Sequence, residues 1–161
     1  VMRKAVLLDT SFFIRFLNEE DPLFINAEGY YRYLIQEKFD LVISTISIAE
    51  YCVKGNVNEL PLLNLQVLPF NLNHGTMAGH LASIAFCARK EKAIELKQRF
   101  IIPNDTKLFA QAATEEYISF YLSSDSESKK IYDLIRINAP VRFEFIDLNI
   151  PYTQFFGTIG L

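Results

Sequence analysis

The sequence predicts an α/β fold, a three-layer α/β/α sandwich in which a central parallel sheet lies between two layers of helices. Short apolar runs alternate along the chain with segments whose apolar residues follow helical spacing. The helical segments are long enough to form the crossover connections that parallel strands require. The chain has 161 residues, enough to bury one sizeable core, so we expect a single domain over residues 1–161.

Five short apolar runs are the candidate strands. The first, second and fourth are almost continuously apolar, which is typical of strands that are covered on both faces. The five runs are Ala5–Leu8, Asp40–Ser44, Leu65–Phe70, Ile118–Ser124 and Val141–Asp147.

Segments with helical character separate these runs. Gly55 is expected to end the helix after the second strand as its C-cap, and Asn73 or Thr76 is expected to cap the long helix that follows the third strand. The apolar tail at residues 149–161 follows no period, and we expect it to cover a sheet edge or to contact a partner. The helical segments are Asp9–Leu17, Leu23–Glu37, Thr45–Gly55, Asn73–Lys97, Asn104–Glu116 and Asp125–Arg136.

The composition argues against several classes of protein. No apolar run approaches the roughly 20 residues of a membrane helix, so no membrane span is expected. Only four apolar residues follow the basic N-terminal residues, fewer than the about 7–15 of a signal peptide, and we expect a cytoplasmic protein. A net charge of -3 and a pI near 5.4 argue against a protein that coats nucleic acid through its whole surface.

The cysteines and histidines do not indicate a zinc site or a disulfide framework. Cys52 and Cys87 lie far apart without a CxxC motif, and we expect two buried, reduced thiols. His74 and His80 are six residues apart, which does not place two imidazoles on one face of a helix.

Four acidic residues lie close to the carboxyl ends of predicted strands or at the starts of helices. Asp9 follows the first strand and Asp125 the fourth, Glu50 lies in the helix after the second strand, and Asp105 opens a helix. Ligands of an open parallel sheet bind beyond the carboxyl ends of its strands. The four side chains would therefore project from one rim of the sheet.

Helix capping is the alternative explanation for each of the four. Asp9 and Asp125 stand where N-caps would accept hydrogen bonds from free backbone N–H groups. Glu50 follows Ser47 at the spacing of a capping box. Asp105, in the first turn of its predicted helix, would complement the helix dipole.

The four acids together indicate more than capping does. Like charges that converge in a partly buried site disfavour ionisation, and a bound cation removes that penalty. Oxygen ligands without His or Cys suit Mg²⁺ or Mn²⁺. Such ions activate water and neutralise charge on a phosphoryl group, so an acidic pocket of this kind predicts phosphodiester hydrolysis.

The ordered set of motifs "LLDTS", "SIAEY", "PNDTKLFAQAA" and "SSD" resembles the PIN-domain ribonucleases, especially the VapC-type toxins, from Val6 to Leu134. The resemblance implies a five-stranded parallel sheet and an Mg²⁺- or Mn²⁺-dependent endoribonuclease that cleaves RNA, with an antitoxin protein as a partner. It also implies the site residues. Asp9, Glu50, Asp105 and Asp125 would be catalytic and hold the metal, and Thr10 and Ser123 would support them, with helix capping as the alternative role of these two hydroxyls.

Other readings of the same residues stay open. The chain could be a noncatalytic PIN-like scaffold that binds RNA or a protein without cutting it. A haloacid-dehalogenase phosphatase is disfavoured because Ser11 stands where its second Asp is needed. The apolar tail and the high Phe content predict a homodimer or a complex with an antitoxin-like protein. Five cations follow the acids closely enough to flank the pocket and guide RNA, or are ordinary surface charges: Arg15, Lys54, Lys107, Lys129 and Lys130.

Overall fold

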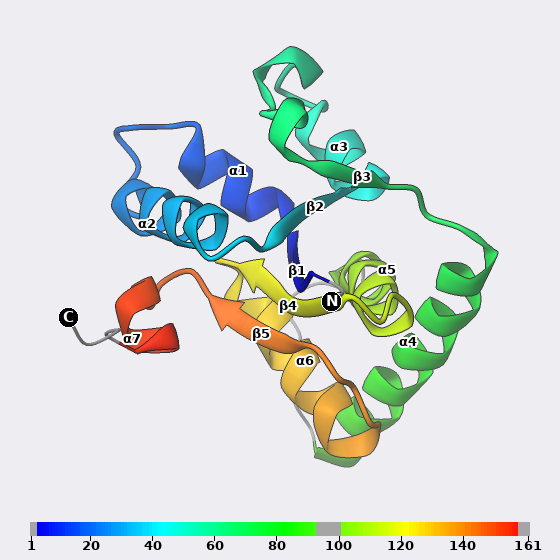
Figure 1. The fold of residues 1–161 in the computed structure, drawn as a ribbon. Helices are drawn as coiled ribbons and strands as arrows, with labels where there is room; N and C mark the ends of the chain where they lie inside the picture. The colour runs from blue at the N-terminus through cyan, green and yellow to red at the C-terminus, as the bar shows by residue number, and fades with distance from the viewer. Residues whose placement is uncertain (1–2, 93–100, 158–161) are drawn as a thin grey trace.

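A computed structural model describes residues 3–92 and 101–157 and contains a five-stranded sheet in the order β3-β2-β1-β4-β5. All neighbouring strands pair in parallel, so the predicted parallel five-stranded sheet is confirmed (Figure 1). The strands are β1 (Ala5–Leu8), β2 (Asp40–Ser44), β3 (Gln66–Leu68), β4 (Ile118–Ser123) and β5 (Glu144–Asp147).

Helices cover both faces of the sheet, as the three-layer prediction requires. One core joins the sheet to α1 and α2, and the other joins it to α4, α5 and α6 (Figure 1). Two short 3₁₀ helices, Val57–Glu59 and Leu62–Asn64, precede β3. The α-helices are α1 (Thr10–Phe16), α2 (Phe24–Gln36), α3 (Thr45–Tyr51), α4 (Leu72–Lys92), α5 (Ile101–Thr114), α6 (Ser126–Asn138) and α7 (Tyr152–Phe156).

The central strand β1 shows why its sequence is continuously apolar. Ala5 and Leu7 face the core of α4, α5 and α6, whereas Val6 and Leu8 face the core of α1 and α2. All four side chains are fully buried, because successive residues of a strand point to opposite faces and both faces are covered.

The strand order places a crevice beside β1. The chain runs from β1 outward to β2 and β3 on one side, then returns to β4 and β5 on the other. Connections therefore leave β1 and β4 in opposite directions, and the crevice at the carboxyl ends of such a strand pair is where open α/β sheets bind ligands. Asp9 and Asp125 follow these two strands.

The described part of the C-terminal tail contains a short helix. Residues 152–156 form the helix α7, which packs against α2 through aromatic rings. The Tyr33 and Phe156 rings stack with centroids 4.6 Å apart, and the Tyr152 ring lies 5.2 Å from the same tyrosine. Gly29 makes this approach possible, because a Cβ there would come within 2.9 Å of the Tyr152 ring.

Several local predictions are wrong. The helix after β2 ends at Tyr51 with Cys52 as its C-cap, and Gly55 has no positive φ and is not the C-cap. The two thiols predicted to be buried, those of Cys52 and Cys87, are exposed. The helix α5 begins at Ile101 instead of Asn104. It therefore includes Pro103, which is tolerated because the first turn of a helix needs no N–H at that position.

The start of α4 also differs from the prediction. Asn71, and neither Asn73 nor Thr76, precedes the helix and accepts a hydrogen bond from the His74 N–H at 3.0 Å. In turn, the His74 Nδ1 accepts a hydrogen bond from the Asn71 N–H. The other ring nitrogen of His74, Nε2, lies 2.8 Å from Glu115 Oε1. The predicted end of this helix at Lys97 lies outside the described residues.

In the ranges that are described, no helix is long and apolar enough to cross a membrane.

Phe156→Ala is expected to destabilise the protein by about 1–3 kcal/mol, because a half-buried ring that packs on α2 is lost. The free energy of unfolding in urea measures this change. Ile25→Ala, at an exposed position of α2, is the control and should change stability by less than about 0.5 kcal/mol. Equal effects of the two substitutions would contradict the packing of α7 on α2.

Candidate active site

The four acids predicted from the sequence line one cleft of about 260 Å³. Asp9 follows β1 and Asp125 follows β4, Glu50 lies on α3 after β2, and Asp105 lies on α5. The parallel sheet brings the carboxyl ends of β1, β2 and β4 to the same edge, which explains why three acids so distant in sequence meet. The remaining lining residues are Thr10, Ser11, Ile14, Asn104 and Leu108.

Asp9 occupies the N-cap position of α1 but does not act as a cap. Its backbone is extended, and its side chain accepts no hydrogen bond from a backbone N–H of the helix. Instead, its Oδ2 accepts hydrogen bonds from the Ser11 and Ser123 hydroxyls, each at 2.8 Å. These two hydrogen bonds orient the Asp9 carboxylate, which lines the cleft although the residue is only 7% exposed.

Asp125 does act as a cap. Its Oδ1 accepts from the Glu127 N–H at 2.8 Å and from the Ser128 N–H at 3.5 Å, the two donors at the start of α6. Capping and a place in the cleft are therefore compatible for this residue, because the cap uses Oδ1 and the half-buried carboxylate still lines the cleft.

Asp105 is buried about as deeply as Asp9, with an exposure of 8%. It is the fifth residue of α5, beyond the first turn, so the helix-dipole explanation is wrong for it. Its Oδ1 accepts from the Ser128 hydroxyl at 2.8 Å, and its Oδ2 is buried without a hydrogen-bond partner among the described residues. Burial raises the pKa of Asp105 to about 8; the Ser128 hydrogen bond opposes this, and the charges of Asp9, Asp125 and Glu50 add to it.

Glu50 is the exposed member of the set. It forms no capping box with Ser47, because Ser44 caps α3 by accepting from the Ile46 N–H at 3.1 Å. The Thr10 hydroxyl donates to Glu50 Oε2 at 3.2 Å. Loss of water around the carboxyl and the charge of Asp9 raise the pKa of Glu50, while Thr10 and Lys107 oppose the rise.

The sequence did not single out two hydroxyls that hold the acids, those of Ser11, which lines the cleft, and of the buried Ser128. The Ser11 hydroxyl donates to Asp9 and accepts from the Ser124 N–H at 3.0 Å, and Ser123 similarly donates to Asp9 and accepts from the Asp125 N–H at 3.1 Å. Each hydroxyl has one proton, and the backbone N–H groups direct both protons to the same carboxylate oxygen. The sequence signal for these two hydroxyls is a serine in the first helical turn after Asp9 and after Asp125.

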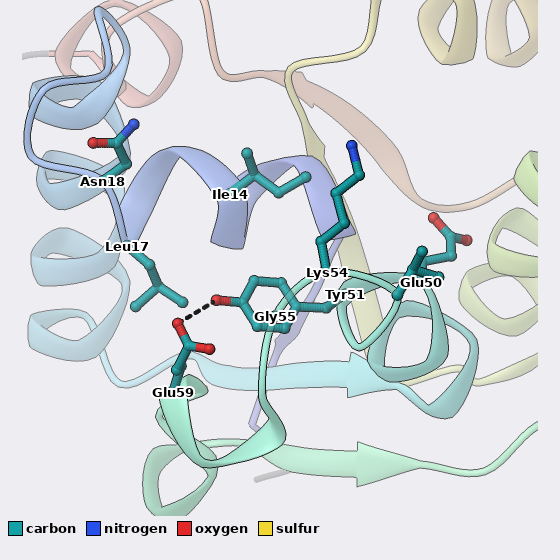
Figure 2. Close-up of a pocket in the computed structure, with 9 residues that line it drawn as sticks. Ile14, Leu17, Asn18, Glu50, Tyr51, Lys54, Gly55 and Glu59 are labelled. Carbon is teal, nitrogen blue, oxygen red and sulfur yellow. Dashed lines mark hydrogen bonds between the residues drawn. The ribbon is translucent and has the colours of Figure 1, made fainter.

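Most of the cations predicted to flank the pocket have other partners. Three of them form ion pairs that do not involve the four acids: Arg15 with Asp21 at 2.7 Å, Lys129 with Asp133 at 2.7 Å, and Lys130 with Glu127 at 3.0 Å. The charge of Lys107 acts on Glu50, and Lys54 lines a groove that shares Glu50 with the cleft (Figure 2). Only these two predicted cations are associated with the site.

The donor set suits a hard divalent cation. Its ligand atoms are carboxylate oxygens, and the partnerless Oδ2 of Asp105 is an uncompensated buried acceptor that a cation would satisfy. Among the described residues, no group of three or more His, Cys, Asp or Glu side chains is arranged to hold a metal ion. The four carboxylates fit the chemistry of Mg²⁺ or Mn²⁺ by ligand type, and their side chains would have to move to meet at one ion.

Comparison with known proteins identifies the fold. No protein-family model and no curated protein matches the sequence. The VapBC2 structure from Rickettsia felis, bound to a promoter DNA fragment, matches with a TM-score of 0.55 and 17% identity, covering 89% of this chain and 99% of that chain. DNA-bound VapBC from Salmonella typhimurium matches with a TM-score of 0.52 and 15% identity, covering 90% and 98%. The chain has a VapC-type PIN-domain fold.

Asp105→Asn is expected to stabilise the cation-free protein increasingly as pH rises from about 4 to about 8. The pKa of Asp105 is raised from 3.8 to about 8 in the folded protein, so the folded state binds the proton more tightly and loses stability across this range. Even one unit of this shift corresponds to about 1.4 kcal/mol, or about 3–6 °C in the unfolding midpoint.

Thermal unfolding in a chelator at several pH values measures the difference. Asp133→Asn, at an exposed acid that pairs with Lys129, is the matched control and should give no such trend. A midpoint difference for Asp105→Asn that stays constant with pH would show that this carboxyl titrates normally.

Proposed function

We propose that this chain is an Mg²⁺- or Mn²⁺-dependent endoribonuclease that hydrolyses RNA phosphodiester bonds, and that it is the toxin of a toxin–antitoxin pair. The observation that carries the proposal is the convergence of Asp9, Glu50, Asp105 and Asp125 on one cleft of a VapC-type fold. The resemblance of the motifs around these acids to PIN-domain ribonucleases supports the reaction type.

Asp9, Asp105 and Asp125, with Glu50 close by, would hold the cation. When bound, the ion would neutralise charge on the phosphoryl group and make water more acidic. Ser11 and Ser123 fix one oxygen of Asp9, and Ser128 fixes one oxygen of Asp105, so each carboxylate keeps its other oxygen for a ligand.

Glu50 is suited to accept a proton from the attacking water. It is exposed at the cleft, its pKa is raised, and Thr10 orients it through Oε2. A general base works best when its pKa lies near the operating pH, so the raised value favours this role. Lys107, whose charge is felt at Glu50, would attract the RNA backbone to the same side of the cleft.

An antitoxin partner is part of the proposal. Both similar structures are VapBC assemblies bound to DNA, and one of the DNAs is a fragment of their promoter. We propose that this chain likewise assembles with an antitoxin protein.

Asp9→Asn is expected to lower divalent-cation-dependent cleavage of RNA on the order of 100-fold or more, because the substitution removes a negatively charged oxygen that the cation needs. A gel assay on single-stranded RNA, with Mn²⁺ or with chelator, measures the rate, and the urea unfolding curve shows that the variant is folded.

Asp133→Asn serves again as the control, since this acid lies on the outer face of α6 and pairs with Lys129. It should cleave at the parent rate. Cleavage by Asp9→Asn at the parent rate would remove Asp9 from the site, and a folded parent that cleaves no RNA with either ion would favour the noncatalytic scaffold.

A further inference from the structure

A second hollow adjoins the acid cleft between α1, α3 and the turn after α3 (Figure 2). We refer to it as the α1–α3 groove. Its volume is about 750 Å³, and Glu50 and Ile14 line both the groove and the acid cleft. The two hollows therefore adjoin at these residues, and a ligand that is longer than the cleft can reach the groove past them.

The walls of the groove carry exposed apolar side chains. Val53 is 77% exposed and Ile14 53% exposed, and Leu17, the C-cap residue of α1, lies three residues after Ile14. Ile14, two residues after the buried Phe12, lies on the other side of α1. The groove thus offers an apolar surface directly beside a charged site.

Tyr51 provides a fixed aromatic ring in this groove. Its hydroxyl donates to Glu59 Oε2 at 3.3 Å, and Glu59 is itself held because its Oε1 accepts from the Asn56 N–H at 2.6 Å (Figure 2). Gly55 gives the ring its space, because a Cβ there would lie within 2.8 Å of the ring Cζ. The ring is therefore positioned before any ligand binds.

Lys54 adds a positive charge to the groove. Its ammonium forms no ion pair within the part of the chain that the structure describes, whereas Arg15, Lys129 and Lys130 all do. An unpaired ammonium beside an apolar surface attracts a phosphate and repels a basic peptide. Glu50 and Glu59 also line the groove, so the charge that can meet a phosphate is local to Lys54.

We propose that the α1–α3 groove binds the nucleotide that neighbours the scissile phosphate of a single-stranded RNA, with its base against Tyr51 and Val53 and its phosphate near Lys54. This inference rests on the proposed function. A polymer whose phosphodiester lies in the acid cleft must continue into adjoining space, and the groove shares Glu50 and Ile14 with that cleft. Bases stack on aromatic side chains only when they are unpaired, so the groove selects single strands over duplexes.

Val53→Glu tests this subsite, because the exposed position tolerates the substitution and the new carboxylate repels the RNA backbone. Two substrates are compared: a short single-stranded oligoribonucleotide, and bis(p-nitrophenyl) phosphate, a small diester without neighbouring nucleotides. The variant is expected to lower kcat/KM for RNA about 10-fold more than for the small diester, mainly through KM. Ile25→Glu is the control, with the same charge change at 78% exposure, and should match the parent.

The salt dependence gives a second readout. Lys54→Met should reduce the slope of log KM against log salt for RNA by about 0.7, the contribution of one phosphate contact to a single strand. An unchanged slope would exclude a contact between this ammonium and the backbone.

The outcomes separate the subsite from the proposed function. A parent that hydrolyses neither substrate overturns the proposed function, and the subsite with it. A parent that hydrolyses both, with a Val53→Glu variant that changes them equally or not at all, overturns the subsite alone. If Val53→Glu instead releases a bound protein partner and leaves RNA cleavage intact, the groove is a protein interface and the proposal is wrong.

Discussion

The repulsion among four carboxylates in one cleft is the constraint on which the rest of this structure depends. Asp9 and Asp105 are almost fully buried; burial and the charges of Asp9, Asp125 and Glu50 raise the pKa of Asp105, and burial and the charge of Asp9 raise the pKa of Glu50. The parallel sheet imposes this proximity, because it brings the ends of β1, β2 and β4 to one edge. A fold that served stability alone would not bury two acids there without cations beside them.

Hydroxyls and backbone N–H groups, instead of cationic side chains, hold the buried acids. Asp9 accepts from two serines, Asp105 from one, and Asp125 from two backbone donors of α6. Neutral donors orient a carboxylate without neutralising its charge. The negative potential therefore stays in the cleft, where it is available to a divalent cation and, through that cation, to a phosphodiester.

Ser128 links two parts of this arrangement. Its hydroxyl donates to Asp105 of α5, while its backbone N–H donates to Asp125 at the start of α6. One residue thus sets the relation between two acids that come from different helices. Ser123 and Ser11 make a corresponding link between Asp9 and the end of β4, across more than a hundred residues of sequence.

The features that the sequence predicted are those set by local patterns. Continuous apolar runs located β1, β2 and β4, and the polar residues that follow them located the edge where Asp9, Glu50 and Asp125 lie. The serine contacts were missed because Ser11 meets Ser123 and Ser124 only through the pairing of β1 with β4, which no local spacing reveals.

Helix ends and the burial of small side chains were missed for a related reason. Gly55 looked like a helix cap, but α3 ends earlier, and the glycine instead makes room for the Tyr51 ring. Cys52 and Cys87 are apolar enough to be buried, yet they fall on the outer faces of their segments. The apolar residues of the tail follow no helical or strand period, but Tyr152 and Phe156 pack on Tyr33 of α2, and this contact positions α7.

The most direct test of the central claim is a crystal structure determined in MnCl₂, with the cation located by its anomalous scattering. The account predicts a peak in the cleft, coordinated by Asp9 and by the Oδ2 of Asp105 that has no protein partner, with Asp125 or Glu50 moved toward it. An empty cleft at an Mn²⁺ concentration that supports RNA cleavage would contradict it.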